Sequence, residues 1–100
     1  MISDRRQNER AAAQFEAEVL YRGSRRMKMP VLDISLGGCM VDSRAWSAKP
    51  GDELSIKLPT LGFQRASVVW IEDQRAGIAF DELLYEPTLE HLSALAPVTA

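Results

Sequence analysis

The clearest pattern in the chain is an alternation of apolar and polar positions. From Ala13 to Tyr21 apolar residues occupy the odd positions, and polar residues occupy the even ones until Leu20. A period of two places alternate side chains on opposite faces of a β-strand. The Ala, Glu and Gln residues of this stretch favour a helix by propensity. The alternation nevertheless places both aromatic residues on one face, so we predict a strand.

Five later segments carry similar strand signals between turn residues. At Val31-Leu32 the apolar positions change phase, which indicates a bulge or bend, and Pro30 requires an edge or bulge position. Glycine, proline and polar pairs separate the segments, as in short hairpin connections. The predicted strands are 27–34, 39–41, 54–58, 63–72 and 76–80.

The last segment of the chain has helical spacing. Pro87 suits a first helical turn, and Leu89, Leu92 and Leu95 recur every three residues on one face. We predict a helix over residues 86–96 whose leucines pack on the core; a partner-binding helix is the alternative. Six short strands and one helix predict a mainly all-β fold, a six-stranded antiparallel barrel closed at one end by the helix.

Length and composition predict one domain. A chain of 100 residues buries enough surface for a single core. We divide it into an arm (1–11), a barrel (12–83) and the helix (86–96), with the arm expected to be mobile because it lacks apolar periodicity. No apolar run approaches the roughly 18 residues that suggest a membrane span, and the opening residues lack the apolar stretch of a signal peptide. We therefore expect a cytoplasmic protein with no membrane span.

The residue inventory argues against metal and catalytic sites. Cys39 is the only cysteine and His91 the only histidine. A zinc site of Cys and His ligands, a disulfide framework and a nucleophile–histidine pair are therefore not expected. The glycines spell neither a dinucleotide fingerprint nor a P-loop. We predict no enzymatic activity, no metal and no cofactor.

Charge is distributed unevenly along the chain. Residues 1–28 hold seven basic and four acidic residues, a balance of +3, whereas residues 29–100 hold five basic and ten acidic residues, a balance of −5. A basic front on an acidic body suggests an anionic partner at the N-terminus. The sequence pI of about 5.3 argues against duplex DNA, which strongly basic domains bind. The expected anion is small and specifically held.

One motif in the basic front is Arg6-x-x-x-Arg10, with Arg5 directly before it. A guanidinium is a planar fork of donors that fits a phosphate or the O6/N7 edge of guanine, and its flat face stacks on a base. The alternative interpretation is a set of solvated surface charges on a tail.

The second motif is Asp33-x-Ser35-x-x-Gly38 at the end of a predicted strand. A carboxylate accepts hydrogen bonds from N1–H and N2–H2 of guanine, a serine donates or accepts, and a glycine lets a ligand approach the backbone. The alternative is a strand-terminating turn, with Asp33 and Ser35 bonded to nearby amides and Gly37 or Gly38 at positive φ. Together the two motifs predict a site for a guanine nucleotide with more than one phosphate.

The order and spacing of these motifs, with 22 residues between them, resemble the PilZ domain family of bacteria. The stretch from Val31 to Cys39 is especially similar, and the stretch from Val68 to Phe80 is similar to the closing strands of the family. The resemblance spans the chain from Arg5 to about Leu95.

The resemblance implies a six-stranded PilZ barrel that binds the second messenger cyclic di-GMP. It implies that Arg6 and Arg10 hold phosphates and guanine edges on an arm that orders around the ligand, and that Asp33, Ser35 and Gly38 hold a guanine. An arginine at the position of Arg5 is associated in the family with capture of a stacked pair of ligand molecules. The signal would pass to a downstream protein that the sequence does not identify.

Two other functions compete with a cyclic di-GMP receptor. Some PilZ-like domains bind no nucleotide and act as protein-interaction modules, but these usually lack the arginine pair. A small barrel can also bind single-stranded nucleic acid, which requires exposed aromatic residues on a basic groove. Only seven aromatic residues are present, most of them at strand positions predicted to be internal.

Overall fold

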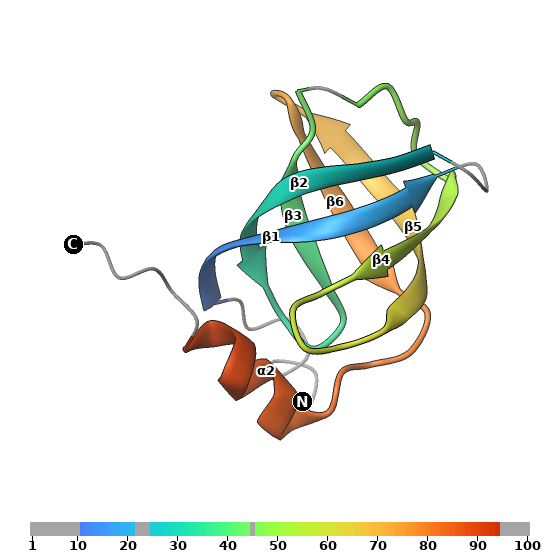
Figure 1. The fold of residues 1–100 in the computed structure, drawn as a ribbon. Coiled ribbons are helices and arrows are strands. Elements are labelled where there is room, and N and C mark those ends of the chain that lie inside the picture. The colour runs from blue at the N-terminus through green and yellow to red at the C-terminus, as the bar shows by residue number, and fades with distance from the viewer. Residues whose placement is uncertain (1–10, 22–24, 45, 95–100) are drawn as a thin grey trace, which may run out of the picture.

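The structure is a computed structural model, and it describes residues 11–21, 25–44 and 46–94. The described strands form a closed antiparallel barrel in the order β1-β2-β3-β6-β5-β4 (Figure 1). This arrangement confirms the predicted fold class. The elements are β1 (Ala11–Tyr21), β2 (Arg25–Ile34), β3 (Gly38–Asp42), β4 (Glu53–Lys57), β5 (Phe63–Glu72), β6 (Arg75–Phe80) and α2 (Glu86–Ser93).

The alternation in β1 has the structural outcome expected of a strand. Ala17, Val19 and Tyr21 are buried, whereas Glu16 and Glu18, at the alternate positions, keep contact with solvent. Strand β2 tolerates Pro30 because its pairing with β3 begins only at Val31, so no ladder hydrogen bond to β3 is missing there. In β1, pairing with β2 along most of the strand and with β4 from Glu18 to Tyr21 overrides the helix propensity of the residues.

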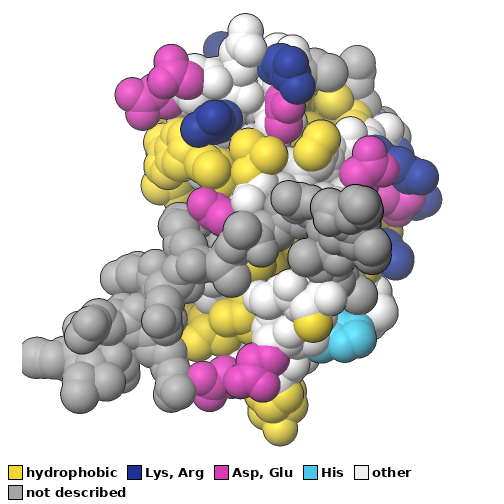
Figure 2. Space-filling model, turned by 90° about the vertical axis from the view of Figure 1, so that its left-hand side faces the viewer, with side chains coloured by type: hydrophobic (Ala, Val, Ile, Leu, Met, Phe, Trp, Pro, Cys, Tyr) yellow, Lys and Arg dark blue, Asp and Glu magenta, His cyan; other side chains and the backbone are white. Residues whose placement is uncertain are grey.

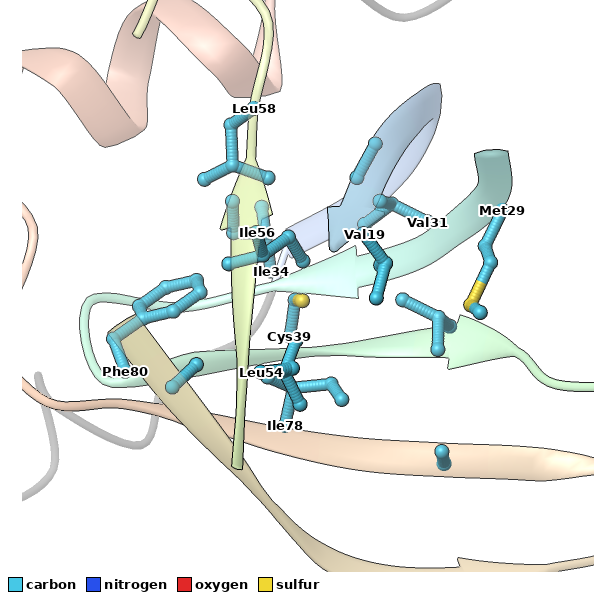
Figure 3. Close-up of a cluster of buried hydrophobic side chains, with 14 of the residues drawn as sticks. Val19, Met29, Val31, Ile34, Cys39, Leu54, Ile56, Leu58, Ile78 and Phe80 are labelled. Carbon is cyan, nitrogen blue, oxygen red and sulfur yellow. The ribbon is translucent and has the colours of Figure 1, made fainter. Parts of the chain in front are cut away.

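Inward side chains from all six strands form one hydrophobic core (Figure 3). Ile34, Cys39 and Ile56 are 0% exposed, and Figure 3 shows the Cys39 thiol among aliphatic side chains. The helix α2 lies at one end of the barrel, and the β3–β4 connection crosses the other end (Figure 1). Leu92 of α2 is fully buried, so the helix closes its end of the barrel as predicted. The third leucine of the predicted stripe, Leu95, lies outside the described residues.

The β3–β4 connection covers its end of the barrel with Trp46, which packs on an aromatic side chain of β1. Trp46 packs edge to face on Tyr21, with ring centroids 5.3 Å apart. The Tyr21 hydroxyl donates a 2.5 Å hydrogen bond to Asp52 Oδ2, which also accepts the Lys49 backbone N–H. Both ends of the core are thus covered, and the outer surface of the barrel is left for binding.

Candidate functional site

The turn between β2 and β3 carries the Asp-x-Ser-x-x-Gly motif. The Ser35 N–H donates to the Gly38 carbonyl at 2.8 Å, and the Ser35 hydroxyl donates to the same oxygen over 3.3 Å. Ser35 is only 4% exposed. Its hydroxyl therefore closes the turn from inside, and the bond runs to a carbonyl rather than to the amide expected from sequence. Neither Gly37 nor Gly38 adopts positive φ, so that part of the alternative prediction is wrong.

Glycine is required at 38 for a reason that the sequence did not show. A Cβ built there would lie 2.1 Å from the Ile78 carbonyl oxygen and 3.3 Å from the Ala79 Cα. The missing side chain thus allows β3 to lie close against β6, with Gly38 paired to Ala79. Glycine at 38 therefore serves the packing of β3 on β6.

Later parts of the chain fix the other side of the same turn. The Phe80 N–H donates to the Gly37 carbonyl at 2.9 Å, and the Leu84 N–H donates to the Leu36 carbonyl at 2.8 Å. Leu36 and Leu84 are both buried, at 8% each. The motif therefore lies on a turn whose backbone is held by hydrogen bonds from two directions, which favours a preorganised surface.

Two bulges orient the side chains beside the turn. The β2–β3 register shifts between Val31 and Asp33, and the β5–β6 register shifts between Val68 and Trp70. An extra residue in a strand reverses the alternation beyond it. Val31 and Val68 point into the core, and the shift then turns Asp33 and Trp70 outward. The bulge at Val31-Leu32 confirms the prediction made from the phase change.

Asp33 and Trp70 belong to one outward-facing row across four strands. Asp33 pairs with Met40, Met40 with Gly77, and Gly77 with Trp70. The residues beside Met40 and Gly77 along their strands, among them Cys39 and Ile78, are buried, whereas Val69 and Ile71 beside Trp70 are exposed. At a spacing of about 4.8 Å between strands, the row spans roughly 14 Å. We call Asp33, Met40, Gly77 and Trp70 the outer row.

The side of the barrel that lies on the left in Figure 1 mixes apolar and charged surface. Figure 2 shows hydrophobic side chains gathered in one area of this face, with acidic and basic side chains at its margin. The indole of Trp70 lies over Gly77 in the outer row: a Cβ on Gly77 would lie 2.3 Å from the indole Nε1. The indole is half-buried, so part of this aromatic ring remains at the surface.

A charged row runs parallel to the outer row, two residues further along the strands. Asp42 pairs with Arg75, and Arg75 pairs with Glu72. Arg44 holds Asp42 in a fork, with its Nη2 2.6 Å from Oδ2 and its Nε 3.0 Å from both carboxylate oxygens. These hydrogen bonds, with the nearby charge of Arg75, lower the pKa of Asp42.

The structure brings some of the predicted site residues together and leaves others unplaced. Asp33, Ser35 and Gly38 share one turn, whereas Arg5, Arg6 and Arg10 lie outside the described residues. The first residues of β1 nevertheless pair at the motif, Ala11 with Ile34 and Ala12 with Asp33. Arg10 is therefore joined by one peptide bond to a residue that pairs beside the turn.

Trp70 and Arg26 lie in different parts of the barrel. Trp70 lies in the outer row, but Arg26 lies near the opposite end of β2, paired with Leu20. The Arg26 guanidinium lies 5.6 Å from the centroid of the Phe63 ring and 3.8 Å from Glu18 Oε1. The sequence did not predict that Met40 and Gly77 lie in the outer row. The alternation over 39–41, in which Met40 is half-buried between two buried residues, is the signal that places Met40 on the outer face.

Two hollows on the surface of the described residues lie away from the outer row. A hollow of about 330 Å³ lies over β4 and β5, and one of about 240 Å³ lies over β1, β2 and the end of β4. Neither shares a residue with the outer row.

In the described ranges, no three His, Cys, Asp or Glu side chains gather as a metal site would require. No helix there is long and apolar enough to cross a membrane.

Comparison with known proteins identifies the family. Residues 4–96 match the PilZ domain family, so the chain belongs to it. Among solved structures, it resembles the Borreliella burgdorferi PlzA protein in complex with c-di-GMP, with a TM-score of 0.66 and 21% identity over 91% of this chain. It also resembles the PilZ domain of CeSA from a cellulose-synthesizing bacterium, with a TM-score of 0.61 and 19% identity over 87% of this chain and 92% of that one.

The chain spans 41% of the length of the PlzA chain. At these identities the likeness to both structures establishes the barrel fold alone. No curated protein sequence matches the chain.

Proposed function

We propose that this protein is a non-enzymatic receptor for cyclic di-GMP. The observation that carries the proposal is the pairing of Ala11 and Ala12 with Ile34 and Asp33, since it brings the chain that bears the arginine motif to the turn that bears the second motif. The PlzA structure, which contains c-di-GMP, and membership of the PilZ family support the choice of ligand.

In this proposal the two motifs divide the ligand between them. Arg6 and Arg10 bind phosphates and a guanine edge, and the Asp33 carboxylate accepts hydrogen bonds from N1–H and N2–H2 of a guanine. Ser35 and Gly38 act indirectly, by closing the turn and by letting β3 approach β6. The indole of Trp70, three strands from Asp33 in the outer row, offers a face on which a base can stack.

The expected affinity follows from the number of charged hydrogen bonds. Each contributes about 1.5–3 kcal/mol, and micromolar binding requires about 8 kcal/mol. With two such bonds from each of the two arginines and the carboxylate, the six bonds contribute about 9–18 kcal/mol, and the cost of ordering residues 1–10 on the ligand reduces this sum. That ordering is the proposed signal to a downstream protein. Arg5 would recruit a second, stacked ligand molecule.

Calorimetric titration with cyclic di-GMP tests the proposal. Arg6→Ala or Arg10→Ala should weaken binding at least about tenfold, which corresponds to 1.4 kcal/mol. Arg26→Ala is the matched control, because Arg26 lies at the other end of β2 and its removal should leave the affinity unchanged. Arg5→Ala should lower the ligand-to-protein ratio before it lowers the affinity.

The same titration decides between this receptor and the alternatives. Equal affinities of wild type, Arg6→Ala and Arg10→Ala would refute the assigned roles. A wild-type protein that ignores cyclic di-GMP, cyclic di-AMP and GTP in a thermal-shift assay would instead favour the interaction module that binds no nucleotide.

A further inference from the structure

An exposed apolar and acidic surface adjoins the motif turn on the side of α2. Leu83 is 53% exposed and Tyr85 is 74% exposed, the highest value among the large hydrophobic residues that the structure describes as exposed. Residues 81–90 hold four of the 14 acidic residues of the chain and no lysine or arginine. We call this the acidic–aromatic surface; it comprises Asp81, Glu82, Leu83, Tyr85, Glu86 and Glu90.

This surface is joined to the β2–β3 turn through backbone and side-chain contacts. Leu84 is buried and donates its N–H to the Leu36 carbonyl, which turns Leu83 and Tyr85 outward on either side of it. A Cβ on Gly37 would lie 3.6 Å from Leu83 Cδ2, so the Leu83 side chain lies beside Gly37. The acidic–aromatic surface therefore adjoins the β2–β3 turn, which also carries Asp33.

The chemistry of the surface suits arginine. A guanidinium stacks on the face of an exposed tyrosine and at the same time pairs with carboxylates beside it. Asp81, Glu82 and Glu90 form no ion pair with another residue that the structure describes. Charge complementarity thus selects a basic occupant.

The position of β1 identifies which basic segment is nearest. Ala11 pairs with Ile34, two residues before Leu36, so the chain enters the barrel beside both surfaces. The five residues from Ala11 back to Arg6 can reach about 17 Å. We propose that without ligand the arginines of residues 1–10 dock on the acidic–aromatic surface, and that cyclic di-GMP competes with this surface for them. The second half rests on the proposed function; the first half does not.

Limited trypsin digestion of the ligand-free protein, followed by intact-mass spectrometry, tests the docking. Cleavage after Arg5, Arg6 and Arg10 should be at least about threefold faster in Glu82→Gln/Glu86→Gln/Glu90→Gln than in wild type, the effect of one or two exposed ion pairs. Added salt should accelerate cleavage of wild type toward the rate of the variant. The control Glu16→Gln/Glu72→Gln/Asp73→Asn removes the same charge elsewhere and should cleave like wild type. Thermal melts check that each variant is folded.

Each outcome bears on one half of the proposal. Equal cleavage rates in wild type and the first variant would overturn the docking, and protection that rises with protein concentration would assign the surface to the arm of a second molecule instead. The first variant should bind cyclic di-GMP about threefold more tightly than the control. Faster cleavage without tighter binding would overturn the competition. Absence of ligand binding by wild type would refute the proposed function, while the digestion would still decide the docking.

Discussion

The indole of Trp70 occupies the space that a side chain on Gly77 would need. The two residues pair across β5 and β6, and a Cβ on Gly77 would lie 2.3 Å from Nε1 and 2.4 Å from Cε2 of the indole. The bulge at Val69 turns Trp70 to the outside of the barrel, and the missing side chain of Gly77 leaves room for the ring there. The orientation of one aromatic side chain thus depends on a strand irregularity and on a missing side chain.

Gly77→Ala is predicted to displace the Trp70 indole without unfolding the barrel. The ring is the end of a side chain that can rotate, so the cost in stability should be about 1–2 kcal/mol, the low part of the range for overpacking. Trp70 emission should shift to the red in a Trp46→Phe background, because the ring gains contact with water. The double-mutant cycle with Trp70→Ala is the control: Gly77→Ala should cost about 1 kcal/mol less once the indole is gone. An equal cost in both backgrounds would contradict the contact.

Gly38→Ala is predicted to be more harmful, because its Cβ would meet backbone that cannot rotate away. The 2.1 Å approach to the Ile78 carbonyl requires β3 and β6 to separate. We expect a loss of at least about 2 kcal/mol in the free energy of unfolding by urea denaturation. Gly62→Ala is the matched control, since nothing lies within 4 Å of its Cβ position. It should change stability by less than about 0.5 kcal/mol, and a similar loss in both variants would disprove the strand contact.

The barrel strands were predictable because most of them keep a period of two between turn residues. The bulge in β2 was predictable too, since the phase change at Val31-Leu32 interrupts that period. The bulge in β5 was not, because Val68 to Ile71 is a run of four apolar residues with no alternation to interrupt. The sequence therefore indicated that Trp70 lies in a strand but not that it faces outward.

The motif turn shows the same division between local and long-range information. The residue types identified where the turn lies, and the alternation placed Asp33 at its start. The role of Ser35 depends on whether the turn closes around its hydroxyl, and the need for glycine at 38 depends on β6, forty residues further along the chain. Contacts between distant segments leave no pattern in a single sequence.

The pKa of the Asp42 carboxyl is predicted to lie below its ordinary value of 3.8, because Arg44 donates hydrogen bonds to its charged form. A pKa lower in the folded than in the unfolded protein stabilises the fold above the unfolded value, and this contribution is lost as pH falls through the folded pKa. Carboxyl NMR titration should show the lowered midpoint, and Arg44→Gln should raise it. Arg65→Gln, which removes an arginine near Glu53, should leave the Asp42 midpoint in place.

The closure of the barrel limits how this protein can meet another macromolecule. Every described strand is bonded on both sides, in the ring β1-β2-β3-β6-β5-β4. Strand addition, in which a visiting peptide continues a sheet through main-chain hydrogen bonds, therefore has room only where a single neighbour pairs, along the first part of β1 and the first part of β2. Elsewhere on the cylinder, recognition has to be carried by side chains on its outside and by the loops at its rims, so partner choice there becomes a matter of surface composition that substitution can alter without rebuilding the sheet.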